Sequence, residues 1–166
     1  MKQSAIPRLL ILAGLFLLAG CGFHLKGYNQ ATPNLDGLFV EQGDRRDTLA
    51  GEIRRELAGV GVKLAASPAE ARHLLRISGE KYSQRVMSVD ANGKVLEYEL
   101  RMQASYEVRG ADGKAVLPLT PMELTRQNNS VGTDELGQRN EAALLRGDMR
   151  RDMASQIIRA LQAQLK

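Results

Sequence analysis

The chain has 166 residues, with 23 Lys and Arg against 19 Asp and Glu, one cysteine, no tryptophan and only seven tyrosines and phenylalanines. This length suits one domain with a single hydrophobic core. The weak net charge of +4 and the few aromatic side chains argue against a nucleic-acid-binding protein, because single strands are usually held by basic grooves with stacking platforms. A single cysteine excludes a disulfide within the chain.

Residues 1–20 have the composition of a secretory signal peptide. Lys2 and Arg8 give a basic start, residues 9–18 are almost wholly apolar, and small residues follow. The apolar run is far shorter than the ~20 residues that a membrane-spanning helix needs. We therefore predict that this segment is cleaved, which leaves a mature chain with a net charge of about +2, since the signal contains two cations and no acid.

Cys21 is predicted to carry a lipid. It follows Leu-Ala-Gly, a sequence that resembles the bacterial lipobox, in which the thiol receives a diacylglyceryl group and cleavage leaves the cysteine as an acylated N-terminus. A free buried cysteine is the alternative, but the signal and the spacing favour acylation. In such lipoproteins an acidic residue directly after the cysteine favours retention in the inner membrane. Gly22 stands at this position, so we expect an outer-membrane protein. Several acyl chains would make the anchor stable.

A tether and a short first strand are predicted after the lipid site. Residues 21–36 contain glycine, asparagine and proline without a helical or strand period, which indicates a lipidated N-terminal tether. Residues 37–166 are expected to form one domain. Its first element is a short strand at residues 38–40, which Gly43-Asp44 would end.

A helix is predicted from Thr48 to about Val60. Asp44 or Asp47 is expected to cap its start, and Gly59 or Gly61 to end it. Apolar residues recur on one face of this segment at helical spacing, while the charged residues lie largely off that face. The apolar positions are Leu49, Ile53, Leu57 and Val60.

Three strands joined by tight turns are predicted next. Residues 74–89 form the first strand, and Asp90-Ala91-Asn92-Gly93 is a turn, because Asn and Gly tolerate the positive φ values of tight hairpins. In residues 96–108 the two-residue period predicts a sheet with one buried and one polar face. The apolar positions are Leu96, Tyr98, Leu100, Met102, Ala104, Tyr106 and Val108.

The last strand and the last helix complete the predicted domain. Ala111-Asp112-Gly113 is a second turn, and residues 116–127 form a strand that Pro118 and Pro121 are expected to bend or bulge. A long helix follows at about residues 138–165, with Arg139, Arg150, Arg151 and Arg159 mostly away from its apolar stripe. The stripe is Ala142, Leu145, Met149, Met153, Ile157 and Ala160. We predict an α+β fold, a two-layer sandwich with two helices packed on a four-stranded, largely antiparallel sheet.

The residues after the lipobox resemble a known family. Cys21-Gly22-Phe23-His24-Leu25-Lys26-Gly27 is similar to the opening of the mature chain in the LPS-assembly lipoprotein family LptE, also called RlpB. Asn92-Gly93 followed by Glu97-Tyr98 is similar to a hairpin of that family. The segment Gln156-Ile157-Ile158-Arg159 is similar to its final helix.

This resemblance implies a non-enzymatic function. Proteins of the family sit inside the LptD outer-membrane β-barrel as a plug, help the barrel assemble, and bind lipopolysaccharide on its way to the outer leaflet. The implied partners are therefore LptD and lipopolysaccharide, whose phosphates can pair with basic side chains. In the family a basic residue of the hairpin turn is linked to this contact, whereas Ala91 stands before Asn92 here. The candidate contacts are Lys94, Arg85 and Arg139, and a solvated surface cation is the alternative for each.

Two other functions are alternatives to this one. A lipoprotein subunit of another envelope lipid-transport complex would share the anchor and the small domain, but would not account for the Phe-His-Leu-Lys opening. A small cell-wall hydrolase would need a nucleophile, a metal site or a His–carboxylate pair, none of which is visible at motif spacing. His24 and His73 are the only histidines, so we expect neither a metal nor a cofactor.

Overall fold

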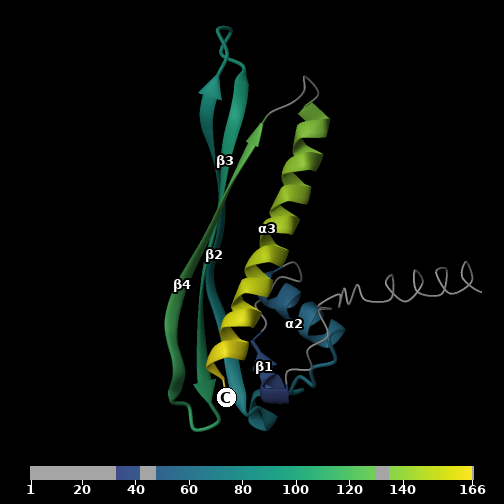
Figure 1. Cartoon of the computed structure of the whole chain (residues 1–166), viewed down its shortest axis with the longest axis vertical. Coiled ribbons are helices and arrows are strands. Elements are labelled where there is room, and N and C mark those ends of the chain that lie inside the picture. The colour runs from purple at the N-terminus through teal and green to yellow at the C-terminus, as the bar shows by residue number, and fades with distance from the viewer. Residues whose placement is uncertain (1–32, 42–47, 130–134, 166) are drawn as a thin grey trace, which may run out of the picture. The chain divides into compact units, whose positions relative to one another are not determined.

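The computed structural model describes residues 33–41, 48–129 and 135–165, with side chains from residue 140 onward in the last helix. The described chain folds as one α+β unit in which two α-helices lie on a four-stranded sheet, as predicted (Figure 1). Two short 3-10 turns accompany these elements. The bounds in chain order are η1 Pro33–Leu35, β1 Leu38–Val40, α2 Leu49–Gly59, η2 Pro68–Glu70, β2 His73–Val89, β3 Val95–Gly110, β4 Ala115–Asn129 and α3 Glu135–Gln164.

The sheet has the strand order β1-β2-β3-β4. The pair β1–β2 is parallel, because α2 and η2 carry the chain back between these strands, whereas β2–β3 and β3–β4 are antiparallel hairpins. Both hairpin turns have the same pattern of backbone hydrogen bonds, although their aspartates stand at different positions of the turn. Gly93 and Gly113 take positive φ values of 79° and 76°, and an aspartate carboxylate accepts the amide of the lysine that follows each glycine.

Helix α2 begins at a different cap from the one expected. Thr48 is the N-cap, and its hydroxyl accepts the backbone N–H of Gly51 at 3.2 Å. The expectation of an aspartate cap at residue 44 or 47 is therefore wrong, because the hydroxyl of Thr48 stands directly before the first helical turn. The predicted glycine stop is confirmed at Gly61, whose φ of 81° ends the helix.

Strand β4 contains the bulge that its prolines predict. The register with β3 shifts between Tyr106 and Val108, opposite Pro118, while Pro121 pairs with Ser105 in the regular register. Because β4 is at the edge of the sheet, neither proline removes a hydrogen bond from a central ladder.

The core lies between the sheet and the two helices. Its centre consists of Met149, Met153 and Ile157 of α3, with Ile53 of α2 and Met102 of β3, all at 0% exposure. Helix α3 runs along one face of the sheet (Figure 1). The opposite face carries the polar residues of β3, so the predicted two-faced strand is confirmed.

The domain starts earlier than residue 37. Leu35 is 1% exposed and belongs to the core. The Asn34 side-chain amide donates to the carbonyls of Gln162 and Leu165 at 3.3 and 2.6 Å, and so satisfies acceptors that the end of α3 leaves free. These contacts make Pro33–Leu35 part of the folded unit, whereas the sequence assigned this segment to the tether.

Two side chains differ from the predicted pattern. Leu96 was expected on the buried face, but it is 44% exposed, because the end of the β2–β3 hairpin extends past the cover that α3 provides (Figure 1). Arg150 was expected to stay away from the apolar stripe, but its side chain is only 12% exposed. It turns inward because its guanidinium donates to the carboxylate of Glu80.

Candidate functional site

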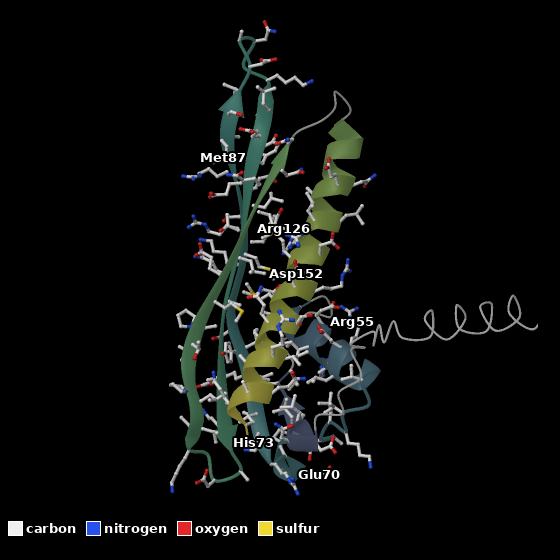
Figure 2. The ribbon with its side chains drawn as sticks, in the orientation of Figure 1. Arg55, Glu70, His73, Met87, Arg126 and Asp152 are labelled. Carbon is white, nitrogen blue, oxygen red and sulfur yellow. The ribbon has the colours of Figure 1, made fainter. Side chains whose placement is uncertain are left out.

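The outer part of the β2–β3 hairpin is the most exposed part of the sheet. We call residues 81–99 the distal hairpin; its turn projects past the ends of β4 and α3 (Figure 1). Five consecutive residues of β2, 83–87, are exposed, so neither face is covered there. The large apolar side chains exposed in this region are Val86 at 48%, Met87 at 44%, Val89 at 53% and Leu96 at 44%. Met87 lies on this part of the sheet in Figure 2.

Lys94 stands at the turn of the distal hairpin. The carboxylate of Asp90 accepts the backbone N–H groups of Asn92 and Lys94, both at 2.8 Å, which fixes the turn. This contact uses the backbone of Lys94, and its ammonium group has no ion pair within the described residues. The turn therefore presents an exposed cation on a rigid backbone.

Arg85 is exposed but already paired. Its guanidinium Nη2 lies 3.3 Å from Oε1 of Glu99, its cross-strand partner, and 68% of the side chain is exposed. Five residues of strand separate Glu99 from Lys94, or roughly 16 Å. The structure thus places the two cations on the same hairpin, with their backbone positions well separated along the strands. Arg139 lies in α3, and its side chain is outside the described residues.

The predicted lipid site and family motif lie outside the described residues. They are Cys21, Gly22, Phe23, His24, Leu25 and Lys26. His73 begins β2, one residue before the predicted start of this strand. In the described ranges, no group of His, Cys, Asp and Glu could hold a metal ion. None of the described helices is both long enough and apolar enough to cross a membrane.

Glu80 connects three elements of the fold, and it is not among the candidate residues predicted from the sequence. Its Oε2 accepts the first backbone N–H of α2, from Leu49, at 2.9 Å, and its Oε1 accepts Nε of Arg150 from α3 at 3.1 Å. The carboxylate also lies at the N-terminus of α2, where the helix dipole favours a negative charge. Glu80 therefore joins β2, α2 and α3 through one side chain.

Further polar contacts join α3 to the sheet. The guanidinium of Arg146 lies over the ring of Tyr82, 5.1 Å from its centroid. The Tyr82 hydroxyl is buried without a hydrogen-bond partner among the described residues. Burial raises the pKa of Tyr82 above its usual value, and the nearby Arg146 opposes this shift. Arg126 of β4 and Asp152 of α3 point toward each other and form an ion pair (Figure 2).

The helix-free side of the sheet, which we call the polar face, has charges that neutralise one another. Arg101 lies 3.5 Å from Glu99 and 3.4 Å from Glu123, and the amide of Gln103 donates to Glu123 at 2.7 Å. Similar pairs continue toward the other end of the sheet: Arg76–Glu41, Arg76–Glu107 and Arg109–Glu107. The paired charges leave this face with little net charge, so it does not resemble a site for one strongly charged ligand.

Solved bacterial lipoproteins have the same fold. The rare lipoprotein B of Shewanella oneidensis superposes with a TM-score of 0.65 at 20% identity, over 76% of this chain and 94% of that one. A lipoprotein B of Nitrosomonas europaea gives 0.66 at 21% identity, over 77% and 83% of the two chains. At these identities the likeness shows the fold alone, an α+β domain with two helices on a four-stranded sheet.

The sequence narrows this class to one family. The profile of the lipopolysaccharide-assembly family LptE matches residues 35–161. The LPS-assembly lipoprotein LptE of Yersinia enterocolitica is 33% identical over 158 residues, which cover 92% of this chain and 74% of the relative. That of Yersinia pestis is 33% identical over 159 residues with the same coverage. The chain belongs to the LptE family, as its opening residues suggested.

Proposed function

We propose that this chain is an outer-membrane lipoprotein that assembles with the LptD β-barrel, plugs its lumen and helps to deliver lipopolysaccharide to the outer leaflet. Membership of the LptE family over residues 35–161 carries the proposal, because a role in lipopolysaccharide assembly comes with that family. The Yersinia relatives bear the name LPS-assembly lipoprotein. The role is a binding and assembly role rather than a catalytic one.

The anchor and the surface both suit this function. A lipid on Cys21 would hold the domain at the outer membrane, with the tether between the lipid and the folded unit. The polar face offers paired charges and amides instead of an apolar surface. Large outer-membrane barrels have polar interiors, so a domain with such a face can be accommodated there without burying unpaired charges.

Lipopolysaccharide contact is assigned to the cations of the distal hairpin and the start of α3. Lys94 supports this assignment best, because it is exposed at a rigid turn and has no ion pair within the described residues. Arg85 would have to share its guanidinium with Glu99, and it can do so because its side chain is 68% exposed. Separate phosphates of one large ligand could contact the separate cations.

Binding of lipopolysaccharide to the purified full chain tests this assignment. The triple variant Lys94→Gln, Arg85→Gln and Arg139→Gln should bind more weakly while its stability stays within about 1 kcal/mol of the parent. Binding by the parent should weaken as salt rises, through screening of the phosphate pairs. A matched triple variant, Lys63→Gln, Lys114→Gln and Arg159→Gln, removes the same charge from exposed positions elsewhere. Equal binding by both triple variants would remove the three candidates from the site.

Depletion in cells tests the function as a whole. If the chain is needed to close or stabilise the barrel, its loss should lower the amount of correctly assembled LptD. New lipopolysaccharide at the cell surface should fall with it. If depletion leaves both quantities unchanged, the proposed function is wrong.

A further inference from the structure

Among the described residues, the outer part of β2 is an open edge of the sheet. β1 pairs only with His73–Leu75 at the start of β2. Beyond residue 80, β3 is the one strand paired with β2 in the described part of the chain. A strand paired on one side has alternate N–H and C=O groups that point outward, and these can template another strand.

The two edges of the sheet differ in how well they resist such pairing. The β4 edge contains Pro118 and Pro121, which lack a donor, together with a bulge. Natural edges are often protected in this way. The β2 edge has no proline from Lys81 to Val89, and its register with β3 is regular from Lys81 to Val86 and shifts only on either side of Ser88. It exposes Val86, Met87 and Val89. Branched apolar side chains on an open edge favour strand addition.

The charge of the open edge indicates what would pair with it. Residues 81–89 contain two cations, Lys81 and Arg85, and no acidic residue. Both are exposed, and they share the polar face with their cross-strand partners Gln103 and Glu99. A second copy of this strand would bring the same cations to the pair, and like charges on adjacent strands are unfavourable.

We propose that the Lys81–Val86 edge of β2 binds an extended segment of a partner protein by strand addition. The segment carries acidic side chains at alternate positions, where they meet Lys81 and Arg85, and branched apolar side chains between them, on the side of Val86. Backbone hydrogen bonds supply the register, and the alternating side chains supply the selectivity. This site goes beyond the proposed function, and it does not require that the partner be the barrel.

Amide hydrogen exchange on the full chain in detergent, measured by NMR, tests the proposal. The probe is a synthetic heptapeptide in which glutamate alternates with valine and threonine. In the free protein, alternate amides of residues 81–86, where the register with β3 is regular, should exchange fast, because they point outward. The peptide should protect those same alternate amides. Binding through side chains alone would not produce such alternation.

Two controls test the charge and the place of binding. A peptide with lysine at each glutamate position should protect the edge at least about threefold less at the same concentration. Lys81→Glu should weaken binding of the acidic peptide by about three- to tenfold, whereas Lys63→Glu, the same charge change at an exposed distant site, should not. Unchanged protection of the Leu100 and Met102 amides shows that each variant is folded.

Three results would overturn the proposal. The first is a lack of alternate protection at any peptide concentration. The second is equal protection by the acidic and the basic peptides, which would show that the cations do not select the strand. The third is protection that rises with protein concentration in the absence of peptide, since a second copy would then occupy the edge.

Discussion

Removing the carboxylate of Glu80 should loosen the packing of both helices on the sheet. In Glu80→Ala, the Leu49 N–H loses its acceptor at 2.9 Å and the Arg150 guanidinium loses its partner at 3.1 Å. The Arg150 side chain is 12% exposed and that of Glu80 is 21% exposed, so water can replace these contacts only in part. A hydrogen bond to a charged group contributes about 1.5–3 kcal/mol, and a buried charge left unpaired costs about 3–5 kcal/mol. With some exposure remaining, we expect a loss of about 2–4 kcal/mol.

A double-mutant cycle separates this pair from general damage to the core. The cycle uses Glu80→Ala and Arg150→Met, because methionine keeps part of the packing of the arginine stem. Urea unfolding followed by circular dichroism should give a coupling energy of about 1–2 kcal/mol, with unchanged m-values. The matched control is the Arg101–Glu123 pair, 3.4 Å apart with side chains 42% and 43% exposed, whose coupling should stay below about 0.5 kcal/mol. Equal coupling in the two cycles would refute the role of Glu80 as a junction.

Three further predictions concern the core, a buried tyrosine and the anchor. Leu100→Ala should lower the free energy of unfolding by about 2–5 kcal/mol, because Leu100 is 1% exposed in the core. Arg101→Ala, on the polar face, should change it by about 1 kcal/mol or less. Equal losses of the two variants in urea unfolding would contradict this assignment of the two faces. Tyr82→Phe should leave stability equal or raise it by up to about 1 kcal/mol, since it removes a buried hydroxyl without a partner among the described residues. The pKa of Tyr82 is raised above 10.0 in the folded state, so above pH 10 the unfolded chain releases the hydroxyl proton more readily than the folded protein does. The parent should therefore lose stability above pH 10. A pH series in which Tyr82→Phe loses just as much stability would contradict this prediction. Cys21→Ser should abolish incorporation of radioactive fatty acid in cells, and label that persists on the variant would exclude Cys21 as the lipid site.

Local patterns predicted most of the architecture. The two-residue period of β3 identified its buried face, and the helical spacing of Ile53, Met149 and Ile157 identified residues that the structure buries completely. Glycine-containing turns predicted both hairpins. These features depend on neighbours a few residues apart in the chain, which is why the sequence alone could reveal them.

The Glu80 junction depends on a feature that alternation cannot reveal. Leu75 and Ile77 face the helices, so an unbroken period would next place Gly79 and Lys81 inward. The register with β3 shifts between residues 78 and 81, where Gly79 has a φ of 65°. The shift brings Glu80 and Tyr82 to the helix side instead. A glycine in a strand indicates a bulge. The partner of Glu80, however, is Arg150, which is 70 residues away in the chain, and only the folded structure brings the two side chains together.

The limits of the candidate site have a similar physical origin. The Asn-Gly turn signal correctly placed Lys94 beside a hairpin turn, because turn chemistry is local. The same alternation that buries Leu100 also assigned Leu96 to the core. Alternation shows which face of a strand a side chain lies on. How far along the strand that face is covered depends on where α3 begins relative to the hairpin, and Leu96 lies beyond the part that α3 covers.

Co-purification from the outer membrane tests the central claim most directly. The tagged full chain should be isolated from detergent-solubilised outer membranes, with an unrelated tagged lipoprotein as the control. We expect the LptD barrel to co-purify with this chain in a constant ratio and to be absent from the control. Recovery of the chain from the outer membrane without LptD would contradict the account, as would recovery of equal amounts of LptD with the control.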